Sequence, residues 1–108
     1  MGVKGSKLSS AASEQVESFV DRLLPLGDVT NKKMFGGYGI FESGKMFALV
    51  NSEGQIFLKV EDANREKFER AGSPQHGRMP YFQIPDEILE DNDRLLVWAQ
   101  EAITLSKG

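Results

Sequence analysis

The chain has 108 residues, no cysteine, one histidine and a formal net charge of -3, with 40% hydrophobic and 27% charged residues. This size and composition are typical of one globular domain that holds a core without disulfides. The lack of cysteine excludes thiolate catalysis and cysteine-bound metal or iron–sulfur sites, and it suits a reducing cytoplasmic setting. No stretch approaches the roughly 20 apolar residues of a membrane span, so we expect no membrane partner.

The first predicted element in chain order is a helix. Apolar residues recur from Val16 to Leu24 at the spacing of one helix face, and Pro25 with Gly27 ends the pattern. Ser10 or Ser13 is suited to capping the start of this helix. Residues 1–12 are therefore expected to form a flexible leader, and residues 13–108 a single domain.

Three strands are predicted next, at residues 38–42, 45–51 and 55–60, with a short lead-in strand before Gly36. Their connections are two or three residues long and contain glycine, which is typical of antiparallel hairpins. Alternation gives the last two strands a wholly apolar core face, formed by Met46, Ala48, Val50, Ile56, Leu58 and Val60.

The opposite face of these strands carries Phe47, Leu49 and Phe57. A solvent-facing surface does not normally hold three large apolar side chains, so other segments or a second subunit must cover them. The pattern makes these residues a candidate self-association face and the chain a candidate homodimer.

The second half alternates helices with one strand. A helix is predicted over residues 63–71, capped by Asp62, then an edge strand over 79–84, a helical turn over 86–90 and a final helix capped by Asp91 or Asn92. Clustered strands with flanking helices favour an α+β two-layer sandwich, with helices packed on an antiparallel sheet.

The glycine-rich string offers two interpretations. Gly36, Gly37 and Gly39 fit a structural turn or bulge between strands. Alternatively, the Gly36-Gly37 turn with Lys32 and Lys33 can bind a nucleotide or another small anion. No helix start follows the glycines, which favours the structural turn.

Charged residues suggest one more candidate site. Lys59, Arg65 and Arg78 can converge on an anionic ligand or an acidic protein partner, or each can pair with a local acid. His76 lies beside Gly77 in a predicted loop, and we expect it to be exposed rather than a general base. The residues thus predict no catalytic residue, no metal and no cofactor.

Direct DNA binding is expected to be weak or absent. Five acidic residues fall within positions 86–93, and neither the start nor the middle of the chain is polybasic. Such a charge pattern repels a phosphate backbone locally, whereas DNA-binding domains present a basic face.

Several strings in order along the chain resemble the N-terminal domain of the TfoX/Sxy family of bacterial competence regulators. The strings are MFGGYGIF at 34–41, GKMFALV at 44–50, FLKV at 57–60, DAN at 62–64, RMPY at 78–81 and LLVWA at 95–99. The resemblance runs from about Val16 to Ile103.

This resemblance implies a helix-plus-antiparallel-sheet fold in a cytoplasmic bacterial protein. For complete family members it implies a coactivator of transcription that acts with the cyclic AMP receptor protein at competence promoters. Complete members carry a second, helical domain, and the present chain ends at Gly108 after one. We therefore expect a regulatory, protein-binding module of the N-terminal type.

Overall fold

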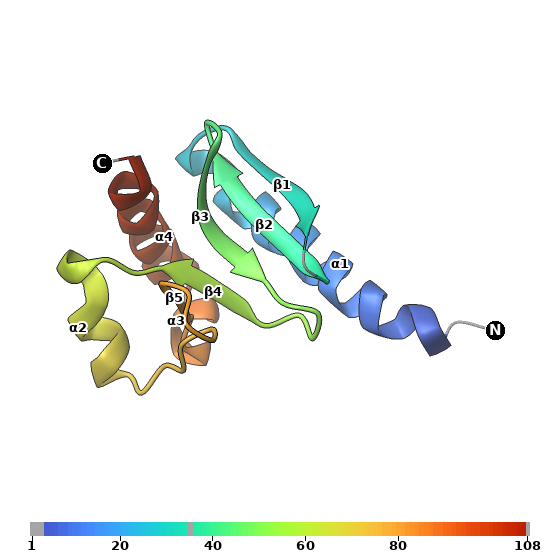
Figure 1. Ribbon diagram of the computed structural model, residues 1–108. Coiled ribbons are helices and arrows are strands. Elements are labelled where there is room, and N and C mark those ends of the chain that lie inside the picture. The colour runs from blue at the N-terminus through green and yellow to red at the C-terminus, as the bar shows by residue number, and fades with distance from the viewer. Residues whose placement is uncertain (1–3, 35, 108) are drawn as a thin grey trace.

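The computed structural model describes residues 4–34 and 36–107, with side chains from Ser13 onward. Helices and strands follow one another as expected for an α+β fold, with one antiparallel sheet (Figure 1). In chain order they are α1 (Lys4–Leu23), the 3-10 helix η1 (Leu24–Leu26), β1 (Val29–Met34), β2 (Gly37–Glu42), β3 (Lys45–Val50), β4 (Ile56–Lys59), α2 (Asp62–Arg70), β5 (Tyr81–Gln83), α3 (Asp86–Leu89) and α4 (Asn92–Lys107).

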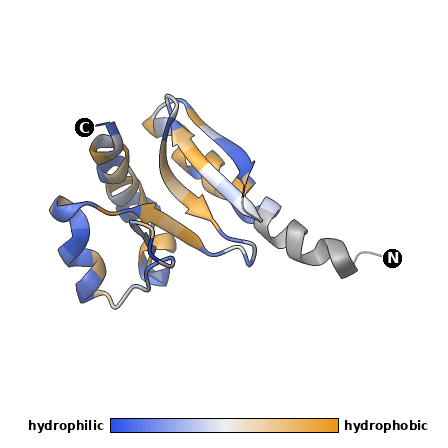
Figure 2. Ribbon diagram, viewed as in Figure 1, coloured by the Kyte–Doolittle hydropathy of each residue, from blue (hydrophilic) through white to orange (hydrophobic). Residues whose placement is uncertain are grey.

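The sheet is a meander in the order β1-β2-β3-β4-β5, because short turns join the first four strands, and the chain returns beside β4 after α2 and a loop to form β5. Helices α1 and α4 pack on one side of it (Figure 1). β3 and β4 form its hydrophobic centre, whereas β1 is a largely exposed edge strand (Figure 2). The α+β prediction is confirmed.

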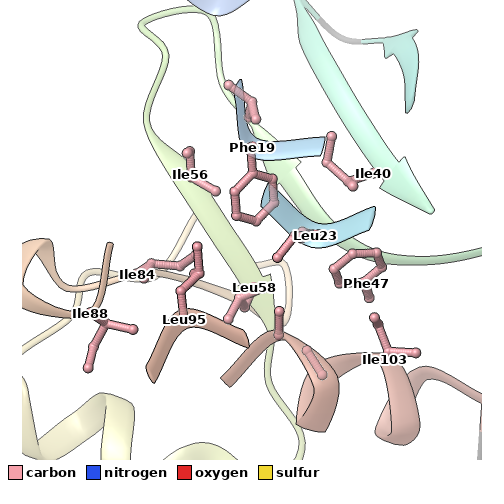
Figure 3. Close-up of a cluster of buried hydrophobic side chains, with 14 of the residues drawn as sticks. Phe19, Leu23, Ile40, Phe47, Ile56, Leu58, Ile84, Ile88, Leu95 and Ile103 are labelled. Carbon is pink, nitrogen blue, oxygen red and sulfur yellow. The ribbon is translucent and has the colours of Figure 1, made fainter. Parts of the chain in front are cut away.

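The main core lies between the sheet and the helices. Its large, fully buried side chains include Phe19 and Leu23 of α1, Ile40 of β2, Leu58 of β4 and Leu95 of α4 (Figure 3).

 All five of these side chains are labelled in Figure 3, and they lie between the sheet and the helices. At about 1.5–3 kcal/mol for each large apolar side chain taken out of water, this layer is the main source of stability.

The first helix is longer than expected. It begins at Lys4 rather than near Ser13, so residues 4–12 of the predicted leader continue α1. Residues 1–3 lie outside the described part of the chain, and the flexibility of the leader stays a prediction. The predicted end is confirmed, because α1 stops at Leu23 and η1 carries Pro25.

The predicted face of Phe47 is wrong. Phe41 pairs with Met46 and Ile40 with Ala48, so Phe47 is the extra residue of a β-bulge in β3. A bulge shifts the alternation by one residue, and Phe47 therefore joins the main core, where it is fully buried on the side of α4 (Figure 3). The same shift moves Met46 from the predicted core face to the opposite face.

The start of α2 also differs from the prediction. Glu61, not Asp62, is the N-cap residue. The buried Asn64 side chain accepts a hydrogen bond from the Glu61 backbone N–H at 2.7 Å and donates one to the Lys59 carbonyl oxygen at 3.1 Å. Asn64 thus fastens the first turn of α2 to the end of β4.

In the part of the chain that the structure describes, no helix is both long and apolar enough to cross a membrane.

Candidate functional site

The sheet face turned away from the helices holds a second, smaller apolar cluster. Leu49, Phe57 and Tyr81 are its buried members, and Met46 packs against them. We call this side the outer face. Every buried apolar residue that the described helices contribute belongs to the main core instead, so side chains of the outer face pack on one another and on a loop.

That loop connects α2 to β5 and folds back over the outer face. The His76 backbone N–H donates to the Tyr81 carbonyl oxygen at 2.8 Å, and the Gln83 N–H donates to the Pro74 carbonyl oxygen at 2.9 Å. The His76 ring meets the Phe57 ring edge-on, with 5.0 Å between centroids. The chain therefore covers Leu49 and Phe57 itself, which were predicted to be covered by another segment or by a second subunit.

A pocket of about 360 Å³ opens on the outer face, between the loop on one side and the start of β2 and the end of β3 on the other. Its apolar walls are formed by Met34, Met46, Leu49 and Met79, and its rim is polar: Asn51, Ser52 and Glu53. We call it the methionine pocket. Met79 is 37% exposed, so part of this residue is accessible from solvent.

Two glycines of β2 lie at or near this pocket in places where a side chain would be crowded. Gly37 lines it directly, and a Cβ at Gly37 would lie 2.1 Å from the Val50 carbonyl oxygen. A Cβ at Gly39 would lie 3.0 Å from the Met34 sulfur. The prediction that Gly36, Gly37 and Gly39 serve the backbone agrees with this geometry, with Gly36 at a positive φ of 78°.

His76 is less exposed than expected. It is half-buried, it lines the methionine pocket, and its Nδ1 atom is buried without a hydrogen-bond partner among the described residues. The expectation of a simple exposed loop residue is therefore wrong, because the ring packs against Phe57.

The Tyr81 hydroxyl is partly withdrawn from solvent on the outer face. Burial raises the pKa of its hydroxyl above the ordinary value, and the nearby Glu61 carboxylate raises it further. The Tyr81 hydroxyl is thus neutral at physiological pH and adds no charge to the outer face.

The three candidate cations lie in different surroundings. Lys59 is 3.7 Å from the Glu61 carboxylate, and a partly exposed pair at this distance contributes little to stability. The Arg65 guanidinium lies 5.6 Å from the centre of the Phe82 ring, which belongs to the main core side. Lys59 follows Phe57 by two residues in β4, so its side chain lies on the outer face as well. Arg65 lies on the other side of the sheet, so these two cations do not converge. Arg78 is exposed beside Met79.

The two lysines of the alternative anion site do not converge either. Lys32 and Lys33 are consecutive residues of β1, and consecutive strand residues point to opposite faces. Gly37 approaches the β3 backbone rather than an open cavity on its Cβ side. This arrangement favours the structural interpretation of the glycine turn.

Another groove lies on the helix side, lined by Leu26, Leu96 and Val97 with three polar neighbours. Val97 is 65% exposed, and the nearby residue Leu24 is 53% exposed. This groove is more open than the methionine pocket, and its exposed apolar residues make it a rival docking surface.

Sequence reasoning missed the methionine pocket. Met79 returns to Met34 across more than forty residues of chain, and no local pattern encodes that approach. One signal was present: Gly37 and Gly39 stand two residues apart, so they leave a strip without side chains on one face of β2.

Fold and pocket together define a small α+β domain that offers an apolar, methionine-lined surface on its sheet. The family described as the TfoX N-terminal domain matches residues 21–105, and the chain belongs to this family.

A curated relative supports the same assignment. The chain is 26% identical over 98 residues to the DNA transformation protein TfoX1 of Aliivibrio fischeri. The match covers 84% of this chain and 47% of the relative, so the chain spans about half the length of that protein.

Proposed function

We propose that this domain is a non-enzymatic regulatory module that binds a protein partner through the methionine pocket. The observation that carries the proposal is the exposed Met79 over a pocket with apolar walls and a polar rim. Recognition surfaces commonly combine a concave apolar centre with a polar edge. Methionine side chains are flexible and polarizable, which suits them to contact apolar side chains of a partner.

The setting of the proposal is bacterial competence. The A. fischeri relative is named a DNA transformation protein, and the family resemblance implies a coactivator. We propose the transcription machinery, or the cyclic AMP receptor protein within it, as the partner. The acidic residues at 86–93 support contact with a protein in preference to direct contact with DNA.

Thioether walls support binding over catalysis, because thioethers neither take up nor release a proton at physiological pH. The apolar wall residues of the pocket offer contact area and shape. We therefore propose no reaction at this site.

A genetic experiment tests the proposal. Met79→Glu places a charge in the pocket mouth at a position exposed enough for the fold to tolerate it. Transformation frequency is measured in a naturally transformable host that depends on this gene. We expect Met79→Glu to lower the frequency at least tenfold with unchanged protein level.

Val97→Glu is the matched control, because it charges the rival groove at another exposed apolar residue. We expect Val97→Glu to transform like the parent. A loss caused by Val97→Glu alone would assign docking to the helix side and contradict the proposal, as would normal transformation with Met79→Glu.

A further inference from the structure

Three of the four methionines and the single histidine of the chain line the methionine pocket: Met34, Met46, Met79 and His76. They come from β1, β3 and the loop before β5. Because the sequence has no cysteine, these four residues are all of its soft metal donors except Met1. We propose that the pocket binds one soft monovalent ion, Cu(I), through thioether sulfurs and the imidazole.

Two of the thioethers lie side by side. The Met34 sulfur is 3.0 Å, and the Met46 methyl carbon 3.3 Å, from the same point, the position that a Cβ on Gly39 would occupy. The missing side chain at Gly39 leaves these two methionines room to meet above the strand. A methionine side chain has three rotatable bonds, so small rotations bring its sulfur toward an ion.

The other two donors are joined by a turn. The Met79 N–H donates to the His76 carbonyl oxygen at 3.0 Å, which places both residues at the ends of one tight turn. The Nδ1 atom of His76 is buried without a hydrogen-bond partner among the described residues. A buried, unpartnered polar atom is costly and calls for an explanation such as an ion.

The donor set decides which ion fits. Thioether and imidazole ligands select soft ions such as Cu(I), whereas Mg²⁺ and Ca²⁺ require oxygen ligands. Over residues 4–34 and 36–107, no group of three histidine, aspartate or glutamate side chains is placed to hold a metal. The proposal therefore excludes the hard divalent ions and Zn²⁺ from this pocket. It does not depend on the proposed protein partner.

Silver nitrate provides a redox-stable probe for the site. Purified full-length chain is titrated with Ag(I) in chloride-free buffer, and the complex is measured by native mass spectrometry. Spectra of ¹³C-methyl-labelled methionine follow the same titration. We expect one Ag(I) per chain, with shifts of the Met34, Met46 and Met79 methyl signals and no shift of Met1. Cu(I), added without oxygen, should displace Ag(I), and Zn²⁺ should leave the signals unchanged.

Two variants test the donors. The triple variant Met34→Leu, Met46→Leu, Met79→Leu keeps apolar volume, so it should stay folded, which circular dichroism checks. It should lose Ag(I) binding, and His76→Asn should weaken binding at least tenfold. Adding Val97→Met to the triple variant restores one exposed thioether away from the pocket and should not restore binding.

Three outcomes of the silver titration would overturn the proposal. The pocket is not a soft-metal site if the parent chain binds no Ag(I), or if the folded triple variant binds it as tightly as the parent. Shifts confined to Met1 would also contradict it. Each of these outcomes leaves the transformation experiment unaffected, so failure of the metal site and failure of the docking site are distinguishable.

Discussion

Lys107 at the end of α4 forms an ion pair with Glu42 at the end of β2, with 2.6 Å between Nζ and Oε1. The Glu42 carboxylate is buried, and it also accepts hydrogen bonds from the Ser43 hydroxyl at 2.8 Å and the Asp28 N–H at 3.3 Å. One side chain thus joins the last helix, the β2–β3 hairpin and the start of β1.

This relationship predicts an acid-sensitive step in stability. The hydrogen bond from Lys107, then that from Ser43, lowers the pKa of Glu42 below its ordinary value, although burial opposes the shift. A carboxyl group whose pKa is lower in the folded state stabilises the fold above its unfolded pKa, and this stabilisation is lost as pH falls through the folded pKa. Glu42→Gln should therefore lower stability at pH 7 and reduce its decline in acid.

Urea unfolding between pH 7 and pH 3 measures this effect. Glu66→Gln is the control, because Glu66 forms an exposed pair with Arg70 and its side chain is 77% exposed. If Glu42→Gln and the parent lose stability in parallel over this range, Glu42 is not the acid-sensitive group.

The cap of α2 predicts a second loss of stability. Asn64→Ala removes the hydrogen bonds to Glu61 and Lys59 from a residue that is only 2% exposed. The free energy of unfolding should fall by about 1–2 kcal/mol. Urea denaturation checks this, with the exposed Gln100→Ala as the comparison. A change of less than about 0.5 kcal/mol, the range of ordinary surface substitutions, would show that the cap contributes little.

Neighbouring glycines should respond differently to substitution. Gly37→Ala puts a methyl group 2.1 Å from the Val50 carbonyl oxygen, so β2 and β3 must separate. Overpacking of this kind costs about 1–3 kcal/mol or more. Gly36→Asn needs only a positive φ, which asparagine tolerates, and its Cβ would lie 4.0 Å from the Ser52 Cβ, an ordinary contact distance. Thermal unfolding should rank Gly37→Ala well below Gly36→Asn, and equal melting temperatures would contradict the close approach.

Element types and the antiparallel order were predictable because alternation, glycine turns and caps are local signals. The faces of the β3 residues were not predictable from the sequence. The bulged residue Phe47 reverses the alternation of faces, and a strict two-residue pattern does not allow for such a bulge. Burial of His76 was equally hidden, because it depends on Phe57, almost twenty residues earlier in the chain. The methionine pocket is assembled from β1, β3 and a loop. It was not predictable because it depends both on the bulge in β3 and on contacts between residues far apart in the chain.

The bulge itself predicts a substitution effect. Phe47→Ala removes a fully buried ring from the main core and should cost about 3–5 kcal/mol of unfolding free energy. Phe41→Ala, on the half-buried outer face, should cost less. Equilibrium unfolding compares the two. If Phe41→Ala proves the more destabilising, the assignment of Phe47 to the core side is wrong.

Photo-crosslinking tests the proposed docking surface most directly. A benzoylphenylalanine placed at Met79, in cells of the transformable host, is irradiated, and adducts are identified by mass spectrometry. The same probe at Val97 reports on the rival groove. The account predicts a discrete adduct with a transcription protein from position 79 and none from position 97. No adduct from position 79, or the same adduct from both positions, would contradict it.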